Sequence, residues 1–134
     1  MLAGCGGGDG KALTKQEYAR KADAICAEGK KQTGALPQPT NLADLASSAD
    51  KTIDILDNAL DDLRKLEPPA SEQKLVAQWL SETEKLKDDL AEIRDRAKEN
   101  DRAAVFEIAR KAEQRNARVN GLGTTLGMKE CNTD

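Results

Sequence analysis

The chain contains no histidine among its 134 residues. This absence removes the Ser–His and Cys–His nucleophile systems and the Glu-x-x-His ligands of di-iron four-helix bundles. No glycine-rich phosphate loop is present, because the glycines at 6–10 precede no strand and those at 121 and 123 lie after a helical pattern. We therefore expect no catalytic residue, no metal and no cofactor, and we interpret the chain as a non-enzyme.

Aromatic residues and long apolar runs are also scarce. Aromatics make up 2 % of the sequence, so a core has to be built from alanine, leucine, isoleucine and valine. Past the N-terminus, no stretch is apolar enough to span a bilayer. Charged residues make up 34 %, yet the net charge is only −3. Acidic and basic residues are therefore nearly balanced and interleaved along the chain. This balance argues against a nucleic-acid partner, because nucleic-acid binding calls for a basic excess on one face.

The N-terminus carries a cysteine in a distinctive setting. The segment Leu2-Ala3-Gly4-Cys5, followed by a glycine-rich run, resembles the lipobox of bacterial lipoproteins. No complete leader precedes it, so we interpret residues 1–13 as a signal-peptide remnant, lipidation site and flexible tether. The resemblance implies that Cys5 carries an acyl lipid such as palmitate, which would hold the chain on the extracytoplasmic face of the cell membrane. The alternative is a chance match in a disordered N-terminus.

The three cysteines fit this interpretation. An odd count in an exported protein leaves one thiol with a separate role, and lipidation of Cys5 supplies it. Cys26 and Cys131 can then form a disulfide, which persists only in an oxidising compartment. The loop of about 105 residues that it closes implies roughly 4–5 kcal/mol of stabilisation. The alternative is two buried reduced thiols. With the cysteines so assigned, no plausible zinc ligand set remains.

Four stretches with helical periodicity follow the tether. The first begins at Thr14, where Thr14-Lys15-Gln16-Glu17 matches a capping box. It weakens at Gly34, before a connector that contains two prolines. Cys26 flanks its apolar stripe, where a returning C-terminal segment could reach it. The stripe consists of Tyr18, Ala22, Ile25 and Gly29.

The second stretch has the most regular apolar pattern. Asn41 is its expected cap, and Pro68-Pro69 prevents its continuation beyond Leu66. Its apolar positions are Leu42, Leu45, Ala49, Ile53, Leu56, Leu60 and Leu63.

Two further helices are expected after the proline pair. Ser71 is the predicted start of the third helix, Asn100-Asp101 is a break followed by a new cap, and Gly121 is the predicted end of the fourth. The third apolar face holds Val76, Trp79, Thr83, Leu86, Leu90, Ile93 and Ala97, and the fourth holds Val105, Ile108, Ala109, Ala112, Asn116 and Val119.

These patterns predict an all-α fold. Short connectors between amphipathic helices favour antiparallel neighbours, and near-heptad spacing favours shallow crossing angles. We predict an up-down-up-down four-helix bundle over residues 14–134, as one monomeric domain. Its C-terminal segment, residues 122–134, would fold back so that Cys131 meets Cys26. The alternative is a long helical hairpin that dimerises.

One stripe of carboxylates follows the second helix. It would be either a weak divalent-cation site or patch for a basic partner, or a solvated helix edge paired in part with cations such as Lys111 and Arg118. We favour the solvated edge, because carboxylates on one helix cannot easily surround Ca²⁺ with six or more oxygens. The stripe consists of Asp50, Asp54, Asp57 and Asp61.

Three residues on apolar faces have two possible roles. Trp79 would be a core residue or the wall of an apolar ligand pocket. Thr83 and Asn116 would fix helix register or line a small cavity. We favour a core role for Trp79, and we name Trp79, Thr83 and Asn116 as the possible ligand-facing residues.

The structured region resembles small exported helical proteins of high-GC Gram-positive bacteria. The resemblance rests on Tyr-x-x-x-Ala-Asp-x-Ile-Cys at residues 18–26 and Gly-Met-x-x-Cys at residues 127–131. Many such proteins pair a cysteine in the first helix with one near the C-terminus. The resemblance implies no particular activity.

Two functions are compatible with these observations. The first is a membrane-tethered, non-catalytic module that presents a charged helical surface to an envelope protein or to the envelope itself. The alternative is a carrier or sensor of a small apolar ligand held between the helices. The scarcity of aromatics argues against the carrier, because ligand pockets are usually rich in them.

Overall fold

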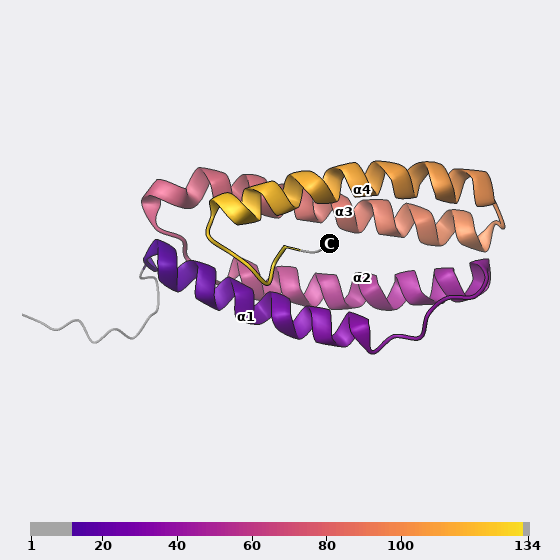
Figure 1. Cartoon of the computed structure of the whole chain (residues 1–134), viewed down its shortest axis with the longest axis horizontal. Helices are drawn as coiled ribbons and strands as arrows, with labels where there is room; N and C mark the ends of the chain where they lie inside the picture. The colour runs from indigo at the N-terminus through magenta and orange to yellow at the C-terminus, as the bar shows by residue number, and fades with distance from the viewer. Residues whose placement is uncertain (1–11, 133–134) are drawn as a thin grey trace, which may run out of the picture.

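The computed structural model describes residues 12–132, and within this range the chain forms an up-down-up-down four-helix bundle (Figure 1). The helices are α1 (Lys15–Gly34), α2 (Leu42–Arg64), α3 (Gln73–Lys98) and α4 (Arg102–Thr125). A disulfide joins Cys26 on α1 to Cys131. The predicted fold class and the link between the first helix and the C-terminal tail are both confirmed.

Local sequence signals set most of the helix ends. Thr14 accepts a hydrogen bond from the Glu17 N–H at 3.1 Å, and the Glu17 carboxylate accepts one from the Thr14 N–H at 2.9 Å. This is the predicted capping box, and its hydrogen bonds lower the pKa of the Glu17 carboxyl. Asn41 caps α2, and Asp101 caps α4 by accepting from the Ala104 N–H at 3.1 Å.

The start of α3 differs from the prediction. Ser71 lies inside a short 3₁₀ turn, η1 (Ala70–Glu72), and Glu72 occupies the cap position without a side-chain cap hydrogen bond. Pro69 is extended, with φ −64° and ψ 151°. The chain therefore winds from the prolines into the helix through the tighter 3₁₀ geometry, which is common at helix N-termini.

The predicted stop at Gly121 is wrong. Helix α4 continues through Gly121 to Thr125, and the chain turns away at Gly127, whose φ is +86°. A glycine inside a helix costs only about 1 kcal/mol. Continuation of the helix carries Leu126, which is 1 % exposed, into the core, and that burial outweighs the local cost.

The buried side chains form two clusters at opposite ends of the bundle. The first surrounds Tyr18 and Trp79, which are 1 % and 2 % exposed. Burial raises the pKa of Tyr18 to about 12, and its hydroxyl has no hydrogen-bond partner within the described part of the chain. The second cluster joins the start of α2 to the turn between α3 and α4. It consists of Ala46, Ile93, Ala97, Val105 and Ile108.

The helices do not all pack on one another. Helix α3 packs closely against α2 and α4, and α1 packs against α2. The C-terminal tail, residues 126–132, turns back from the end of α4 and lies between α1 and α4 (Figure 1). The tail therefore bridges the seam between the first and last helices and completes this end of the bundle.

Candidate functional site

A cavity of about 280 Å³, partly open to solvent, lies between the helices and is lined by residues of all four helices and of the tail. Leucines supply most of the wall opposite α1, with Leu56 and Leu63 on α2 and Leu86 and Leu90 on α3. The remaining lining residues are Cys26, Gly29, Lys30, Thr33, Thr52, Ala59, Trp79, Thr83, Asn116, Val119, Glu130 and Cys131.

The cavity exists because α1 presents little bulk to this part of the interior. Its lining positions are Cys26, Gly29, Lys30 and Thr33, which share one helix face. None of them projects a large apolar side chain into the bundle, as Tyr18 does near the start of α1. Beside the cavity, the apolar stripe of α1 therefore ends in a glycine, Gly29, whereas α2 and α3 still carry leucines.

The three residues predicted as possible ligand-facing side chains, Trp79, Thr83 and Asn116, all line this one cavity. Trp79 is also a core residue at 2 % exposure, so its two proposed roles coincide. The Thr83 hydroxyl donates to the Trp79 carbonyl oxygen at 2.8 Å. Its proton is therefore committed to its own helix, and its two lone pairs remain as acceptors.

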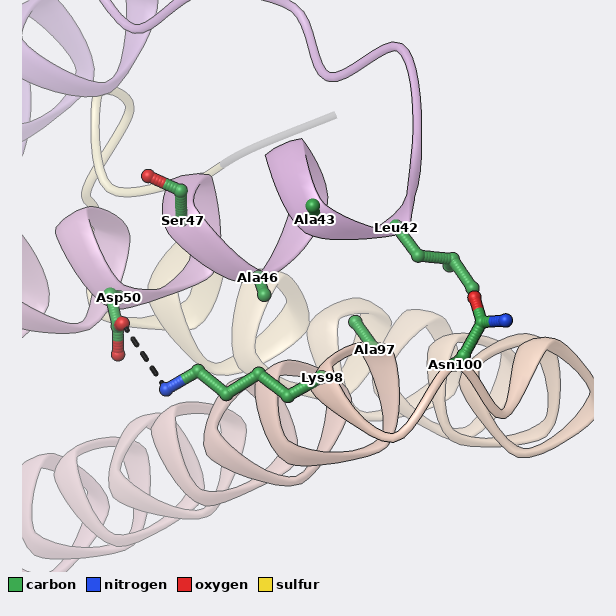
Figure 2. Close-up of a pocket in the computed structure, with 8 residues that line it drawn as sticks. All are labelled: Leu42, Ala43, Ala46, Ser47, Asp50, Ala97, Lys98 and Asn100. Carbon is green, nitrogen blue, oxygen red and sulfur yellow. Dashed lines mark ion pairs between the residues drawn. The ribbon is translucent and has the colours of Figure 1, made fainter.

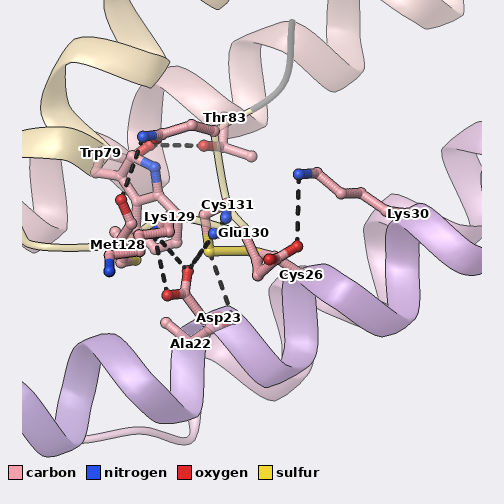
Figure 3. The surroundings of a disulfide bond; sticks show 11 residues. Ala22, Asp23, Cys26, Lys30, Trp79, Thr83, Met128, Lys129, Glu130 and Cys131 are labelled. Carbon is pink, nitrogen blue, oxygen red and sulfur yellow. Dashed lines mark hydrogen bonds and ion pairs between the residues drawn. A yellow bond between two sulfur atoms is a disulfide. The ribbon is translucent and has the colours of Figure 1, made fainter.

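The tail is fixed to α1 by one carboxylate. Asp23 accepts hydrogen bonds from three consecutive backbone N–H groups, those of Lys129 at 3.0 Å, Glu130 at 2.8 Å and Cys131 at 3.2 Å (Figure 3). Sequence reasoning missed this role for Asp23. The available signal was its position one helical turn before Cys26, on the same face of α1.

The disulfide lies one turn further along α1 (Figure 3). Cys26 and Cys131 have Cα atoms 4.9 Å apart, which confirms the predicted pairing. Both cysteines line the cavity, and beside them Lys30 and Glu130 form an ion pair at 3.8 Å. Among the described residues that line the cavity, Lys30 and Glu130 are the only charged ones, and we call this pair the rim.

A second, more open hollow lies at the other end of the bundle (Figure 2). It is formed by the start of α2 and the end of α3, and the Lys98 ammonium reaches across it to Asp50 at 3.7 Å. Small side chains such as Ala43 and Ala46 line the α2 side (Figure 2). The hollow is a shallow surface groove, and we assign it no site.

The carboxylate stripe of α2 is largely a set of interhelical contacts. Asp50 pairs with Arg94 at 3.1 Å, and Asp57 hydrogen-bonds Lys87, which raises the pKa of Lys87. These partners lie on α3, not on α4 where Lys111 and Arg118 were expected to supply the cations. Asp54 and Asp61 are exposed. Within residues 12–132, no group of three or more His, Cys, Asp or Glu side chains is placed to hold a metal.

The described residues set further limits on the site. Cys5, the predicted lipidation site, lies outside residues 12–132, so its lipid remains a prediction. None of the helices in that range is both long and apolar enough to cross a bilayer. Phe106, on α4, is the one large hydrophobic side chain exposed within that range, at 67 %.

Comparisons with known proteins do not extend this description. No protein-family model, curated protein or solved structure matches the chain.

Proposed function

We propose that this chain is a lipid-anchored, extracytoplasmic, non-catalytic domain that carries or senses a small apolar ligand between its helices. The observation that supports it best is the cavity itself, which has leucine-rich walls and is shared by all four helices. Apolar surface is transferred favourably from water into such an environment. At about 280 Å³, the cavity lies just below the usual range for ligand pockets, roughly 300–1,000 Å³.

The chemistry of the walls favours binding over catalysis. Among the described lining residues, the charged side chains are Lys30 and Glu130, which pair with each other at the rim, and the other polar side-chain groups are hydroxyls, one amide and the indole N–H of Trp79. Such groups orient a ligand by hydrogen bonding. The anchor is carried over from the lipobox resemblance and would keep the domain beside a membrane, where apolar molecules are abundant.

Native mass spectrometry of protein extracted from source-cell membranes tests this proposal. We expect a covalent mass increase on Cys5 and a second, non-covalent mass that is lost on denaturation. The Leu56→Trp variant, which places bulk in the cavity, should keep the covalent lipid and lose the second mass. A native protein that carries the lipid and never retains a second molecule would refute the carrier function, and an unmodified Cys5 would refute the anchor.

A second proposal is the interaction module that presents a helical surface to an envelope protein. Its support is Phe106, 67 % exposed, on the first part of α4. The start of α4 lies at the end of the bundle opposite the start of α1 (Figure 1), so Phe106 would face away from a tethered membrane. Cross-linking in the native envelope should recover a partner that Phe106→Ala weakens. An unchanged cross-link pattern in the variant would refute this role for Phe106.

A further inference from the structure

We infer that a basic hollow between α1 and the C-terminal tail binds the phosphate of an anionic phospholipid headgroup, and so lays this end of the domain on the membrane surface. The hollow is separate from the cavity beside the disulfide. Its charge and position carry the inference that it binds a phosphate, whereas the choice of a lipid as the partner rests on the proposed membrane anchor at Cys5.

The hollow lies where the start of the tail passes the first turns of α1 (Figure 1). It has a volume of about 490 Å³ and opens to solvent. Ala19 and Leu126, both buried, form its apolar floor. Most of the remaining wall is charged, and we call this feature the basic hollow. Its charged residues are Lys15, Arg20 and Asp23 on α1 and Lys129 on the tail.

Helical periodicity gathers the α1 residues of the basic hollow on one face. Successive residues are about 100° apart around a helix, so the five lining positions of α1, at 15, 16, 19, 20 and 23, fall within an arc of about 140°. Asp23 holds the backbone N–H groups of residues 129–131 (Figure 3). The side chain of Lys129 is thereby brought from the tail to the same space as the α1 cations.

Positive charge is in excess on this surface. Three lining cations face one carboxylate, which leaves a local net charge of +2 (3 − 1) in a chain whose net charge is −3. That carboxylate, Asp23, accepts its three backbone N–H groups at 2.8–3.2 Å, and such groups offset part of an anion's charge. An anion is therefore attracted to this place in spite of the acidic chain.

Two of the three cations are available to a ligand. Lys15 is paired with Glu72 at 3.4 Å, but Arg20 and Lys129 are exposed and form no ion pair within residues 12–132. Glu17, three residues before Arg20, is held by the Thr14 N–H at 2.9 Å. A guanidinium binds phosphate oxygens as a fork and an ammonium binds them as a point charge, so a phosphate would gain both without breaking an internal pair.

The position of the basic hollow favours a membrane as the source of the phosphate. The hollow begins at Lys15, the first residue of α1, and the preceding chain is fixed there by the Leu13 N–H, which donates to the Glu67 carbonyl oxygen at 2.9 Å. Ten residues lead from Cys5 to Lys15 (15 − 5), which span at most about 36 Å. A lipid on Cys5 would therefore keep headgroups within reach of the hollow.

Co-sedimentation of the full-length Cys5→Ser chain with vesicles tests the site without the anchor. At an ionic strength of about 0.1 M, where charges are screened beyond about 10 Å, the chain should bind vesicles that contain phosphatidylglycerol and not vesicles of phosphatidylcholine alone. Arg20→Gln/Lys129→Gln in this chain should weaken binding roughly 25-fold, because each cation near an anionic surface contributes about fivefold.

The matched control is Lys21→Gln/Lys111→Gln in the same chain. It removes the same charge from two exposed cations that lie outside the basic hollow and form no ion pair within residues 12–132. It should change the affinity by no more than about twofold, because these charges lie beyond the screening distance from the bound surface. Equal losses in the two variants would overturn the site, since net charge and not the hollow would then control binding.

Further outcomes separate this inference from the proposed anchor. No binding of the Cys5→Ser chain to anionic vesicles would overturn the inference, and a lipid found on native Cys5 would leave the anchor standing. Vesicle binding that depends on Arg20 and Lys129, together with an unmodified native Cys5, would support the site and refute the anchor. Binding of inorganic phosphate or of polyglutamate without vesicle binding would overturn the lipid as partner.

Discussion

Removal of the disulfide should cost this domain a large share of its stability and leave its native structure intact. In the Cys26→Ala/Cys131→Ala variant, the tail keeps its three hydrogen bonds to Asp23. Leu126 also remains in the core, where it is now 1 % exposed. The main effect therefore falls on the unfolded chain, which is no longer closed into a loop.

The magnitude follows from the sequence separation of the two cysteines, 105 residues. The chain-entropy relation gives a loss of about 16 cal/mol/K for a loop of this size, or about 4.8 kcal/mol at 25 °C. Domains of this kind are stable by only about 5–15 kcal/mol, so the variant should fold but unfold much more readily.

Urea denaturation followed by circular dichroism and Trp79 fluorescence measures the effect. At an m-value of about 1.5 kcal/mol/M, the midpoint should fall by about 3 M. Wild-type protein held reduced is the control, because it lacks the cross-link but keeps both sulfur atoms. The loop-entropy explanation would be refuted if the variant lost less than about 1 kcal/mol of unfolding free energy. It would also be refuted if the stabilities of the variant and of the reduced wild-type protein differed by more than about 2 kcal/mol.

Four other variants test single residues. Tyr18→Phe should leave stability at pH 7 unchanged or raise it by up to about 1 kcal/mol, because it removes a buried hydroxyl without a partner among residues 12–132. Burial raises the pKa of Tyr18 to about 12, whereas an unfolded chain releases this proton near pH 10. The stability of the wild-type protein should therefore fall as the pH rises from about 10 to 12. In thermal melts at a series of pH values, Tyr18→Phe should reduce that decline. Gly121→Ala should stabilise the fold by about 0.5–1 kcal/mol, since a Cβ at this helical position meets nothing within 4 Å. Gly127→Ala should destabilise the fold by about 1–2 kcal/mol, because the backbone there has a φ of +86°. Equal melting temperatures for the two variants would contradict the placement of Gly121 inside the helix and of Gly127 in the turn. Asp23→Ala should cost about 1–3 kcal/mol in urea unfolding, and an unaltered midpoint would show that the tail does not depend on this carboxylate.

Several features could be predicted because they depend on short-range chemistry. The capping box at Thr14, the cap at Asn41 and the cap at Asp101 each involve partners three residues apart. The disulfide was predictable for a different reason. Only three cysteines are present. The lipobox resemblance assigned Cys5 to lipidation, which left Cys26 and Cys131 as the one possible pair.

The candidate site was only partly predictable. Periodicity placed Trp79, Thr83 and Asn116 on inward faces, and all three line the cavity. Periodicity carries no information on volume, so it could not show that Gly29 and Thr33 leave space opposite the leucines. The role of Asp23 was equally hidden, because its three donors are more than 100 residues away in sequence.

The sequence by itself determined the helical class, most helix boundaries and the inward faces, because each depends on neighbours within a turn or two. It also favoured the cysteine pair, once the lipobox resemblance assigned Cys5 to lipidation. Only the tertiary structure decided that Gly121 stays helical, that α3 supplies the cations for Asp50 and Asp57 of α2, and that a partly open cavity lies beside the disulfide. Those outcomes depend on how much buried surface distant segments gain together. That gain is fixed by the packing of the whole bundle and can override a local preference worth about 1 kcal/mol.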